Sequence, residues 1–122
     1  MSSRVATLTI EDLSVAQLAA YNHADLDAFC ACYHAHIEIL DHTGIATLKG
    51  MAAFRARYTQ MFADHTDVVA TVDQRMVLGR HSVEREHWSR VHRAIGECLG
   101  GTVIVRYTES EGLIRYAEFL KE

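Results

Sequence analysis

Apolar residues recur at helical spacing in three segments of the N-terminal half. Residues 11–22 combine strong helix formers with small apolar side chains, which suits a helix buried against a broad surface. A second helix is predicted after Asp25, a typical N-cap residue, because Leu26, Phe29, Cys30 and Tyr33 follow the i, i+3, i+4, i+7 spacing. A third helix is predicted after Gly50, with Arg55 and Arg57 left to solvent. Its apolar stripe consists of Met51, Phe54, Tyr58, Met61 and Phe62.

The apolar period changes to two after residue 68, which predicts strands. The expected strands cover residues 68–78, 81–93, 101–108 and 113–120, and one earlier strand covers residues 36–41. Helices followed by a run of antiparallel strands predict an α+β domain whose N-terminal helices pack on one face of a curved, mostly antiparallel sheet. Such a sheet closed by helices forms a cone. One face of the first long strand is predicted to carry Val68, Ala70, Val72, Gln74, Met76 and Leu78.

Composition predicts one soluble domain spanning residues 1–122. The chain has 122 residues, no proline and a net charge of -4, so neither a linker nor a nucleic acid partner is expected. The segment Met1–Ala6 lacks the long apolar run of a secretory signal, and nowhere do 18 apolar residues run together. We therefore expect a cytoplasmic protein with no membrane partner.

The cysteine and histidine spacings do not match a known metal site. Cys30 and Cys32 form a Cys-x-Cys pair with a third cysteine elsewhere, and this odd set fits neither a disulfide framework nor a zinc knuckle. We interpret all three as reduced core thiols. His34 and His36 lie near His42 in the sequence, but no Glu-x-x-His spacing supports a metal site. No metal and no cofactor are expected.

Asp41 is the leading candidate for chemistry. It follows Ile37 and Ile39 at strand spacing, so its carboxylate should point toward the core, where it needs a partner or a catalytic role. Desolvation would then raise its pKa to a value useful for a general base. The alternative is structural, because an aspartate before Thr43 and Gly44 is also common turn chemistry.

The order of the parts resembles the nuclear transport factor 2-like (cystatin-like) superfold over nearly the whole chain. The resemblance rests on the helix, the segment 22–29, the strand ending at Asp41, the helix after Gly50 and the meandering strands. Three short motifs, Val77-Leu78-Gly79, Glu84-Arg85-Glu86 and Glu111-Gly112-Leu113-Ile114, are most similar to the SnoaL-like and steroid delta-isomerase-like branch. The resemblance implies a conical fold with a pocket between sheet and helices, often in a homodimer packed through the outer sheet face.

The resemblance to ketosteroid isomerase, an enzyme with an aspartate base and an oxyanion hole of a tyrosine and a protonated aspartate, covers only part of that site. The base position falls on Asp41. The tyrosine position falls on Gln17, and the second acid falls on Ile104 or Val103, which donate no hydrogen bond. Gln17 offers an amide N–H, and Tyr21 lies one helical turn further along the same face.

The strand around Glu86 supplies the remaining candidates. We expect Glu84, Glu86 and Trp88 to line the cavity, with Glu86 opposite Asp41. If the strand is slipped by one residue, the face with His87 looks inward and His87 becomes the acid–base partner. Alternatively, both glutamates are solvated or pair across strands with Arg75 and Arg106. The predicted apolar wall consists of Phe29, Tyr58, Phe62 and Trp88.

Three functions remain open. The first is a cofactor-independent enzyme of isomerase, cyclase or hydrolase type acting on a small apolar molecule, with Asp41 as base. The second is a ligand-binding or assembly module without chemistry. The third is an epoxide hydrolase, which needs an arginine between two carboxylates, with Arg75, Arg85 and Arg106 as candidates. Apolar side chains on both faces of the strand 101–108 also predict a homodimer.

Overall fold

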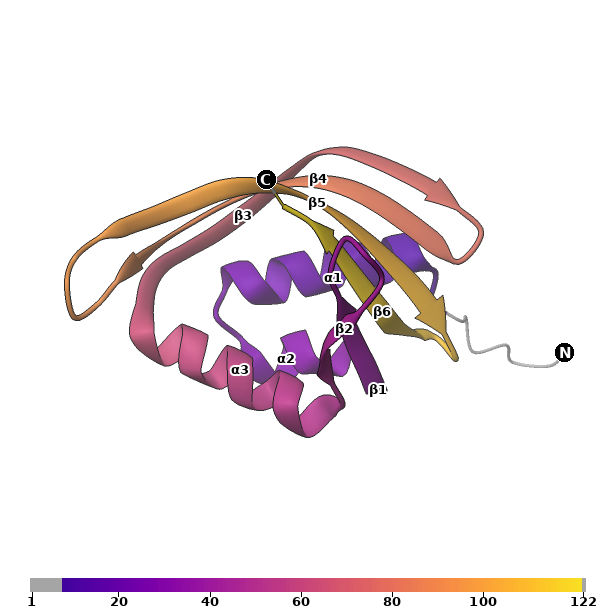
Figure 1. The fold of residues 1–122 in the computed structure, drawn as a ribbon, viewed down its shortest axis with the longest axis horizontal. Helices are drawn as coiled ribbons and strands as arrows, with labels where there is room; N and C mark the ends of the chain where they lie inside the picture. Colours follow the sequence, from indigo (N-terminus) through magenta and orange to yellow (C-terminus); the bar gives the residue numbers. More distant parts are fainter. Residues whose placement is uncertain (1–7, 122) are drawn as a thin grey trace, which may run out of the picture.

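Three helices occupy the hollow of a strongly curved sheet (Figure 1). The computed structural model describes residues 8–121, and Met1–Ala6, on which the expectation about a secretory signal rests, lies outside them. The α+β architecture with helices on one face of a curved sheet is confirmed. The elements in chain order are α1 (Ile10–Asn22), α2 (Leu26–Ala31), β1 (Tyr33–Leu40), β2 (Ala46–Lys49), α3 (Met51–Asp64), β3 (His65–Leu78), β4 (His81–His92), β5 (Cys98–Ser110) and β6 (Leu113–Leu120).

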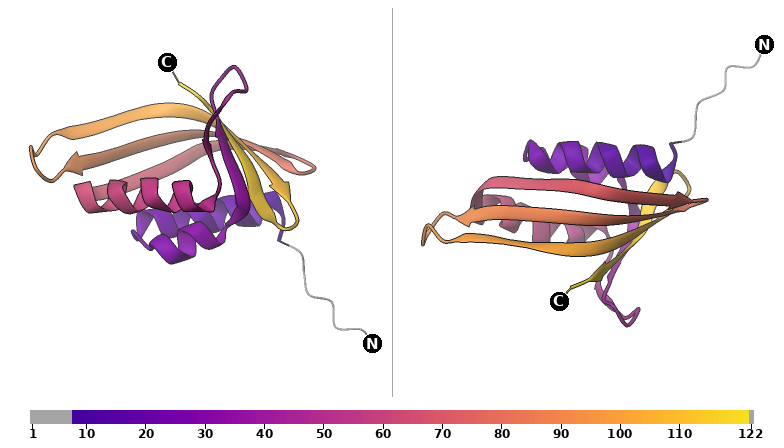
Figure 2. Two further views of the ribbon diagram at one scale, coloured as in Figure 1. Left: turned by 60° about the horizontal axis from the view of Figure 1, so that its bottom comes forward. Right: turned by 90° about the horizontal axis from the view of Figure 1, so that it is seen from above.

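The six strands form one sheet in the order β2-β1-β6-β5-β4-β3. Only β1 and β6 pair in parallel, and every other neighbouring pair is antiparallel. Two further views show how the long strands β3, β4 and β5 bend over α1 and α3 (Figure 2). The short strand β2 was not predicted, because four residues between two glycine-containing turns carry little periodic signal.

The helix starts follow local capping chemistry. Thr9 accepts a hydrogen bond from the Asp12 backbone N–H at 3.1 Å, and the Asp12 carboxylate accepts one from the Thr9 N–H at 3.1 Å, which forms a capping box. Asp25 caps α2 as predicted by accepting from the Ala28 N–H at 3.1 Å. These caps fix where α1 and α2 begin.

Across residues 8–121, no helix has both the length and the apolar character needed to cross a membrane.

Aromatic residues from the helices and from the sheet form the core. Phe29 of α2 stacks on Phe54 of α3 with ring centroids 5.6 Å apart, and Tyr33 of β1 lies 4.4 Å from Phe54. Cys30 and Cys32 are buried free thiols, as predicted, whereas Cys98 is exposed, so its assignment to the core was wrong.

A bulge at Asp73 changes which face β3 presents. Asp73 has no partner in the register, because Val72 pairs with Glu86 and Gln74 with Arg85. The predicted face from Val68 to Leu78 therefore switches sides halfway, and Met76 and Leu78 are 71% and 80% exposed. Arg75 turns inward instead, opposite the buried Glu84. The prediction of a single apolar face was wrong because period-two counting assumes an unbroken ladder.

Candidate active site

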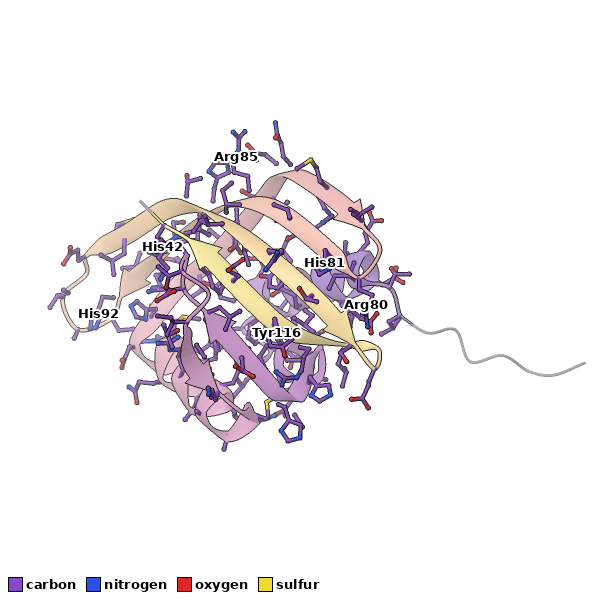
Figure 3. The ribbon with its side chains drawn as sticks, turned by 45° about the vertical axis from the view of Figure 1, so that its right-hand side comes forward. His42, Arg80, His81, Arg85, His92 and Tyr116 are labelled. Atoms are coloured by element: carbon purple, nitrogen blue, oxygen red, sulfur yellow. The ribbon has the colours of Figure 1, made fainter. Side chains whose placement is uncertain are left out.

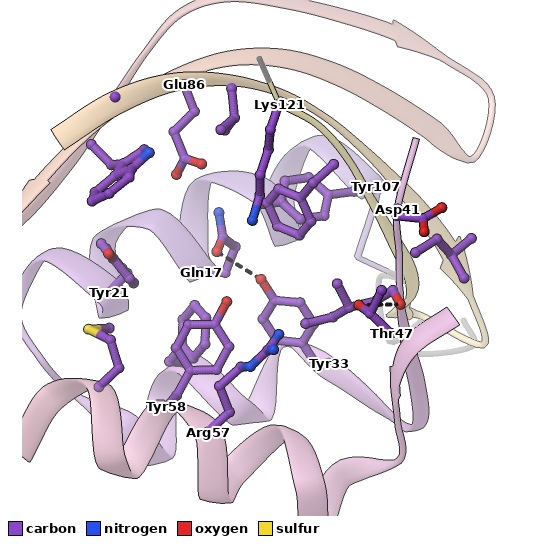
Figure 4. A pocket seen from close by; sticks show the side chains of 18 of the residues that line it. Gln17, Tyr21, Tyr33, Asp41, Thr47, Arg57, Tyr58, Glu86, Tyr107 and Lys121 are labelled. Atoms are coloured by element: carbon purple, nitrogen blue, oxygen red, sulfur yellow. Dashed lines mark hydrogen bonds between the residues drawn. The ribbon is translucent and has the colours of Figure 1, made fainter. Parts of the chain in front are cut away.

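A cavity of about 730 Å³ lies between the concave face of the sheet and helices α1 and α3. Its inner wall is mainly aromatic, and its polar groups come from six different elements (Figure 4). The size suits a small organic molecule. Its lining includes Gln17, Tyr21, Phe29, Tyr33, Arg57, Tyr58, Glu86, Trp88, Arg90, Val103, Tyr107, Phe119 and Lys121.

Glu86 reaches into this cavity from the middle of β4 (Figure 4). Its neighbours across the ladder are apolar, Val72 on β3 and Val103 on β5. Burial, with a smaller contribution from the negative charge of Glu84, raises the pKa of Glu86 to about 7. A carboxyl group with this pKa exchanges its proton readily at neutral pH, which is the property that general acid–base catalysis requires.

Buried hydroxyls and an amide lie across the cavity from Glu86. The Tyr33 hydroxyl donates to the Gln17 Oε1 at 2.9 Å, and Gln17 Nε2 donates to the Ser14 carbonyl at 3.2 Å. Burial raises the pKa of Tyr33, Tyr58 and Tyr107 above the ordinary tyrosine value, so these hydroxyls remain neutral donors at physiological pH. Figure 4 shows the Tyr58 hydroxyl directed into the cavity from α3.

Asp41 lies at the rim of the cavity, and its carboxylate is committed to a turn. Its Oδ1 accepts hydrogen bonds from the Thr43 N–H at 2.8 Å and the Ile45 N–H at 3.2 Å, and from the Thr43 hydroxyl. The Thr43 contacts lower the pKa of Asp41, so the expectation that desolvation raises this pKa was wrong. Ile37 and Ile39 do face the core, but β1 ends at Leu40 and its pairing with β2 shifts register there.

His87 lies on the outer face of the sheet, where Arg85 also projects (Figure 3). His87 Nε2 is 3.0 Å from Asp73 Oδ2, and its Nδ1 is 2.8 Å from the Thr102 hydroxyl. The structure therefore places His87 away from the cavity and turns the face with Glu86 and Trp88 inward, which was the first expectation. The assignment of His87 as an acid–base partner within the cavity was wrong because strand alternation directs it outward.

Glu84 shares the inner face with Glu86 but does not line the cavity. Its side chain is only 1% exposed, and it accepts from Arg75 Nε at 2.6 Å and from the Ser82 hydroxyl at 2.9 Å. The pairing with Arg75 matches the structural alternative considered for this glutamate. Glu84 therefore acts on the cavity only through its charge.

The predicted apolar wall is largely assembled in the structure. Phe29, Tyr58 and Trp88 line the cavity together with Tyr21 and Gln17. Phe62 is not among the lining residues. It packs behind the wall instead, with ring centroids 5.7 Å from Tyr21 and 6.5 Å from Phe29.

None of the three arginines considered for an epoxide hydrolase lines the cavity. Arg75 pairs with Glu84, Arg85 binds Asp73 at 2.6 Å, and Arg106 binds Glu118 at 3.1 Å. An epoxide hydrolase site requires an arginine between two carboxylates in the cavity, and none of these three arginines supplies it. Across residues 8–121, no three His, Cys, Asp or Glu side chains gather as a metal centre would need.

The cavity residues missed as site residues from the sequence include Tyr33, Arg57, Arg90, Tyr107 and Lys121. Arg90 continues the alternation of Glu86 and Trp88 along β4, and Tyr107 continues that of Val103 along β5, so both carried a usable signal. Arg57 was assigned to solvent. It is exposed, but Figure 4 shows its guanidinium turned toward the cavity.

Comparison with known proteins identifies the family. The model of the SnoaL-like domain matches residues 15–117, and the chain belongs to this family. The predicted resemblance to the SnoaL-like branch of the nuclear transport factor 2-like superfold is thereby confirmed. No curated protein matches the chain.

Several solved structures share the fold at low sequence identity. An uncharacterized cystatin-fold protein of Novosphingobium aromaticivorans is 21% identical, with 93% of this chain and 99% of that chain covered and a TM-score of 0.83. A LEH-like epoxide hydrolase of M. tuberculosis is 11% identical, with 93% and 82% covered and a TM-score of 0.79. A protein of Catenulispora acidiphila with a ketosteroid isomerase-like fold, in complex with trimethylamine, is 13% identical, with 91% and 85% covered and a TM-score of 0.76. These likenesses establish the fold.

Proposed function

We propose that the cavity catalyses cofactor-independent proton transfer on a small, largely apolar carbonyl compound, with Glu86 carrying the proton. The observation behind this proposal is a carboxyl group with a pKa of about 7 inside an aromatic cavity that also presents neutral tyrosine hydroxyls. Solved SnoaL-fold neighbours include an epoxide hydrolase-like enzyme, which is consistent with a catalytic use of this fold.

In the proposed step, ionised Glu86 removes a proton from the carbon next to the substrate carbonyl. The C–H bonding pair moves into the enolate, and the Tyr58 hydroxyl donates a hydrogen bond to the developing oxyanion. Glu86 then returns its proton to the same or another carbon, which gives exchange or isomerisation. A positioned acid–base group of this kind typically contributes about 10²–10⁴-fold in rate.

Asp41 is the alternative proton carrier. Its carboxylate already accepts three hydrogen bonds from Thr43 and Ile45, and its pKa is lowered. Both features stabilise the ionised form and make Asp41 a weaker base than Glu86. We therefore assign the proton transfer to Glu86 and a turn-stabilising role to Asp41.

The test is hydrogen–deuterium exchange at carbon in a panel of small cyclic and aryl ketones, followed by NMR in D₂O. This assay detects proton abstraction even when the physiological substrate and its reaction product are not known. We expect exchange by the wild type, a loss of about 10²-fold or more in Glu86→Gln, and retention in Asp41→Asn. Retained exchange in Glu86→Gln would refute the assignment. Binding of panel members without any exchange would favour a ligand-binding module.

We also propose that the chain forms a homodimer through the outer face of the sheet. Several apolar side chains on this face are exposed, including Val69 at 43%, Met76 at 71% and Leu120 at 46%. A second copy would cover them, as an isologous interface requires. Multi-angle light scattering at micromolar concentration should return twice the chain mass, and a monomer mass would contradict this proposal.

A further inference from the structure

Three cationic side chains from separate parts of the chain meet at the cavity. Arg57 lies on α3, Arg90 lies on β4, and Lys121 directly follows the end of β6. Within residues 8–121, none of them has a carboxylate within 4.0 Å. By contrast, Arg55, Arg75, Arg85, Arg106 and Arg115 each have a carboxylate partner.

Arg90 gives an independent sign of a missing partner. Its guanidinium carbon lies 4.6 Å from the centroid of the Trp88 ring, which fixes the side chain against the cavity wall. Its Nε is buried and has no hydrogen-bond partner within the described part of the chain. Buried donors are normally satisfied in native proteins, so the Arg90 guanidinium keeps unused hydrogen-bonding capacity at the cavity wall.

The carboxylates of the cavity do not neutralise these cations. Asp41 and Glu86 are the acidic residues of its lining. Asp41 is held by Thr43 and Ile45, and within residues 8–121 no arginine or lysine nitrogen lies within 4.0 Å of the Glu86 carboxylate. Arg57 and Lys121 are exposed lining residues and mark the mouth of the cavity, and within residues 8–121 their positive charge is left for a ligand.

We propose that this cavity binds a small organic anion, with its apolar body against Trp88 and its acidic group at the mouth between Arg57 and Lys121. Figure 4 shows both cationic groups turned toward the cavity. Arginine presents paired donors that match a carboxylate, and charge-assisted hydrogen bonds are about twice as strong as neutral ones. The anion site is the cavity to which we assign the proposed function, so this proposal rests on that function and limits its substrates to organic acids.

Glu86 gives this anion site a pH dependence. When ionised, Glu86 repels the anionic ligand in the same cavity, so the affinity of the protein for an organic acid should fall as pH rises from 6 to 8. His42 also lines the cavity, and the Glu86→Gln variant separates the contribution of Glu86 from that of His42. The groups that face Glu86 from the surrounding elements are Tyr21 of α1, Tyr33 of β1, Tyr58 of α3, Glu84 of β4 and Tyr107 of β5.

The experiment compares 4-phenylbutyrate with its neutral isostere 4-phenylbutanamide, which differ in one charge. Trp88 is the only tryptophan and lines the cavity, so its fluorescence reports binding directly. We expect the acid to bind at least about tenfold more tightly than the amide. Arg57→Gln and Lys121→Gln should each reduce this preference severalfold. The matched control Arg55→Gln removes a cation of the same helix that pairs with Asp27 at 2.8 Å, and it should preserve the preference.

Equal affinities for acid and amide, or no binding of the acid at millimolar concentration, would overturn the inference. An equal loss in Arg55→Gln and Arg57→Gln would also overturn it, because the preference would then reflect overall charge. The proposed catalysis is measured separately, by hydrogen–deuterium exchange at carbon. Exchange that depends on Glu86 without a preference for acids leaves the proposed function intact, and a preference for acids without exchange leaves the anion site intact.

Discussion

Replacing Glu86 with glutamine should stabilise the protein, and the gain should grow as pH rises. The native state holds the pKa of Glu86 at about 7, whereas the unfolded chain has the ordinary value of 4.5. Between these values the folded protein binds more protons than the unfolded chain, so its stability falls as pH rises. Since one pKa unit corresponds to about 1.4 kcal/mol, ionisation of Glu86 destabilises the native state by roughly 3 kcal/mol above pH 7.

Urea unfolding followed by far-ultraviolet circular dichroism between pH 5 and 8 measures this effect. Circular dichroism is preferred because the Trp88 fluorescence arises beside Glu86 and would report the local change. The difference in free energy of unfolding between Glu86→Gln and wild type should be below about 1 kcal/mol at pH 5 and approach roughly 3 kcal/mol at pH 8. Asp73, Asp41 and Asp12 have lowered pKa values, so their contributions are lost only at more acidic pH.

Glu97→Gln is the control, because Glu97 is an exposed carboxylate in the turn between β4 and β5. The stability difference of Glu86→Gln from wild type should change with pH by clearly more than that of Glu97→Gln. A difference for Glu86→Gln that is constant from pH 5 to 8 would refute the reasoning. It would mean that solvent reaches Glu86 freely and that the carboxyl group is not prepared for proton transfer at neutral pH.

Three further variants test the surrounding structure. Asp41→Asn should lower the melting temperature, because the turn loses a charged acceptor, while carbon exchange persists. Glu84→Gln should cost about 3 kcal/mol in urea unfolding, since it leaves Arg75 beside a neutral group in a buried pair. Gly100→Ala should destabilise by about 1–3 kcal/mol, because the added Cβ would lie 2.9 Å from the Trp88 carbonyl oxygen, a backbone atom that cannot turn aside; unchanged unfolding would show that β4 and β5 adjust.

Much of the fold could be predicted because local signals agree with it. Asp25 marks the start of α2 by direct capping, and the spacing after Gly50 defines α3. The long strands follow alternation over many residues. What escaped prediction depends on breaks in the ladder, which leave no clear mark in the sequence. The bulge at Asp73 switches the faces of β3 halfway, and the register shift between Ile39 and Leu40 comes where β1 ends, just before Asp41.

The site was predictable in its composition more than in its roles. Alternation along β4 correctly grouped Glu86 with Trp88, and the same counting favoured Asp41 over both. Our proposal ranks Glu86 above Asp41 because proton affinity depends on burial and on neighbouring charges, which only the three-dimensional arrangement defines. Arg57 escaped for a related reason, since a long side chain on an exposed helical position can still bend toward a cavity mouth.

The bulge in β3 has a consequence for the outer face of the sheet. Removing Asp73 would leave a continuous ladder in which Gln74 still lies opposite Arg85 and Arg75 still lies opposite Glu84, so the buried ion pair would remain. The loss would fall on the outer face, where Arg85 and His87 share the Asp73 carboxylate. One additional backbone unit in β3 thus adds a carboxylate to the outer surface and leaves the inward pairs of Glu84 and Glu86 in place.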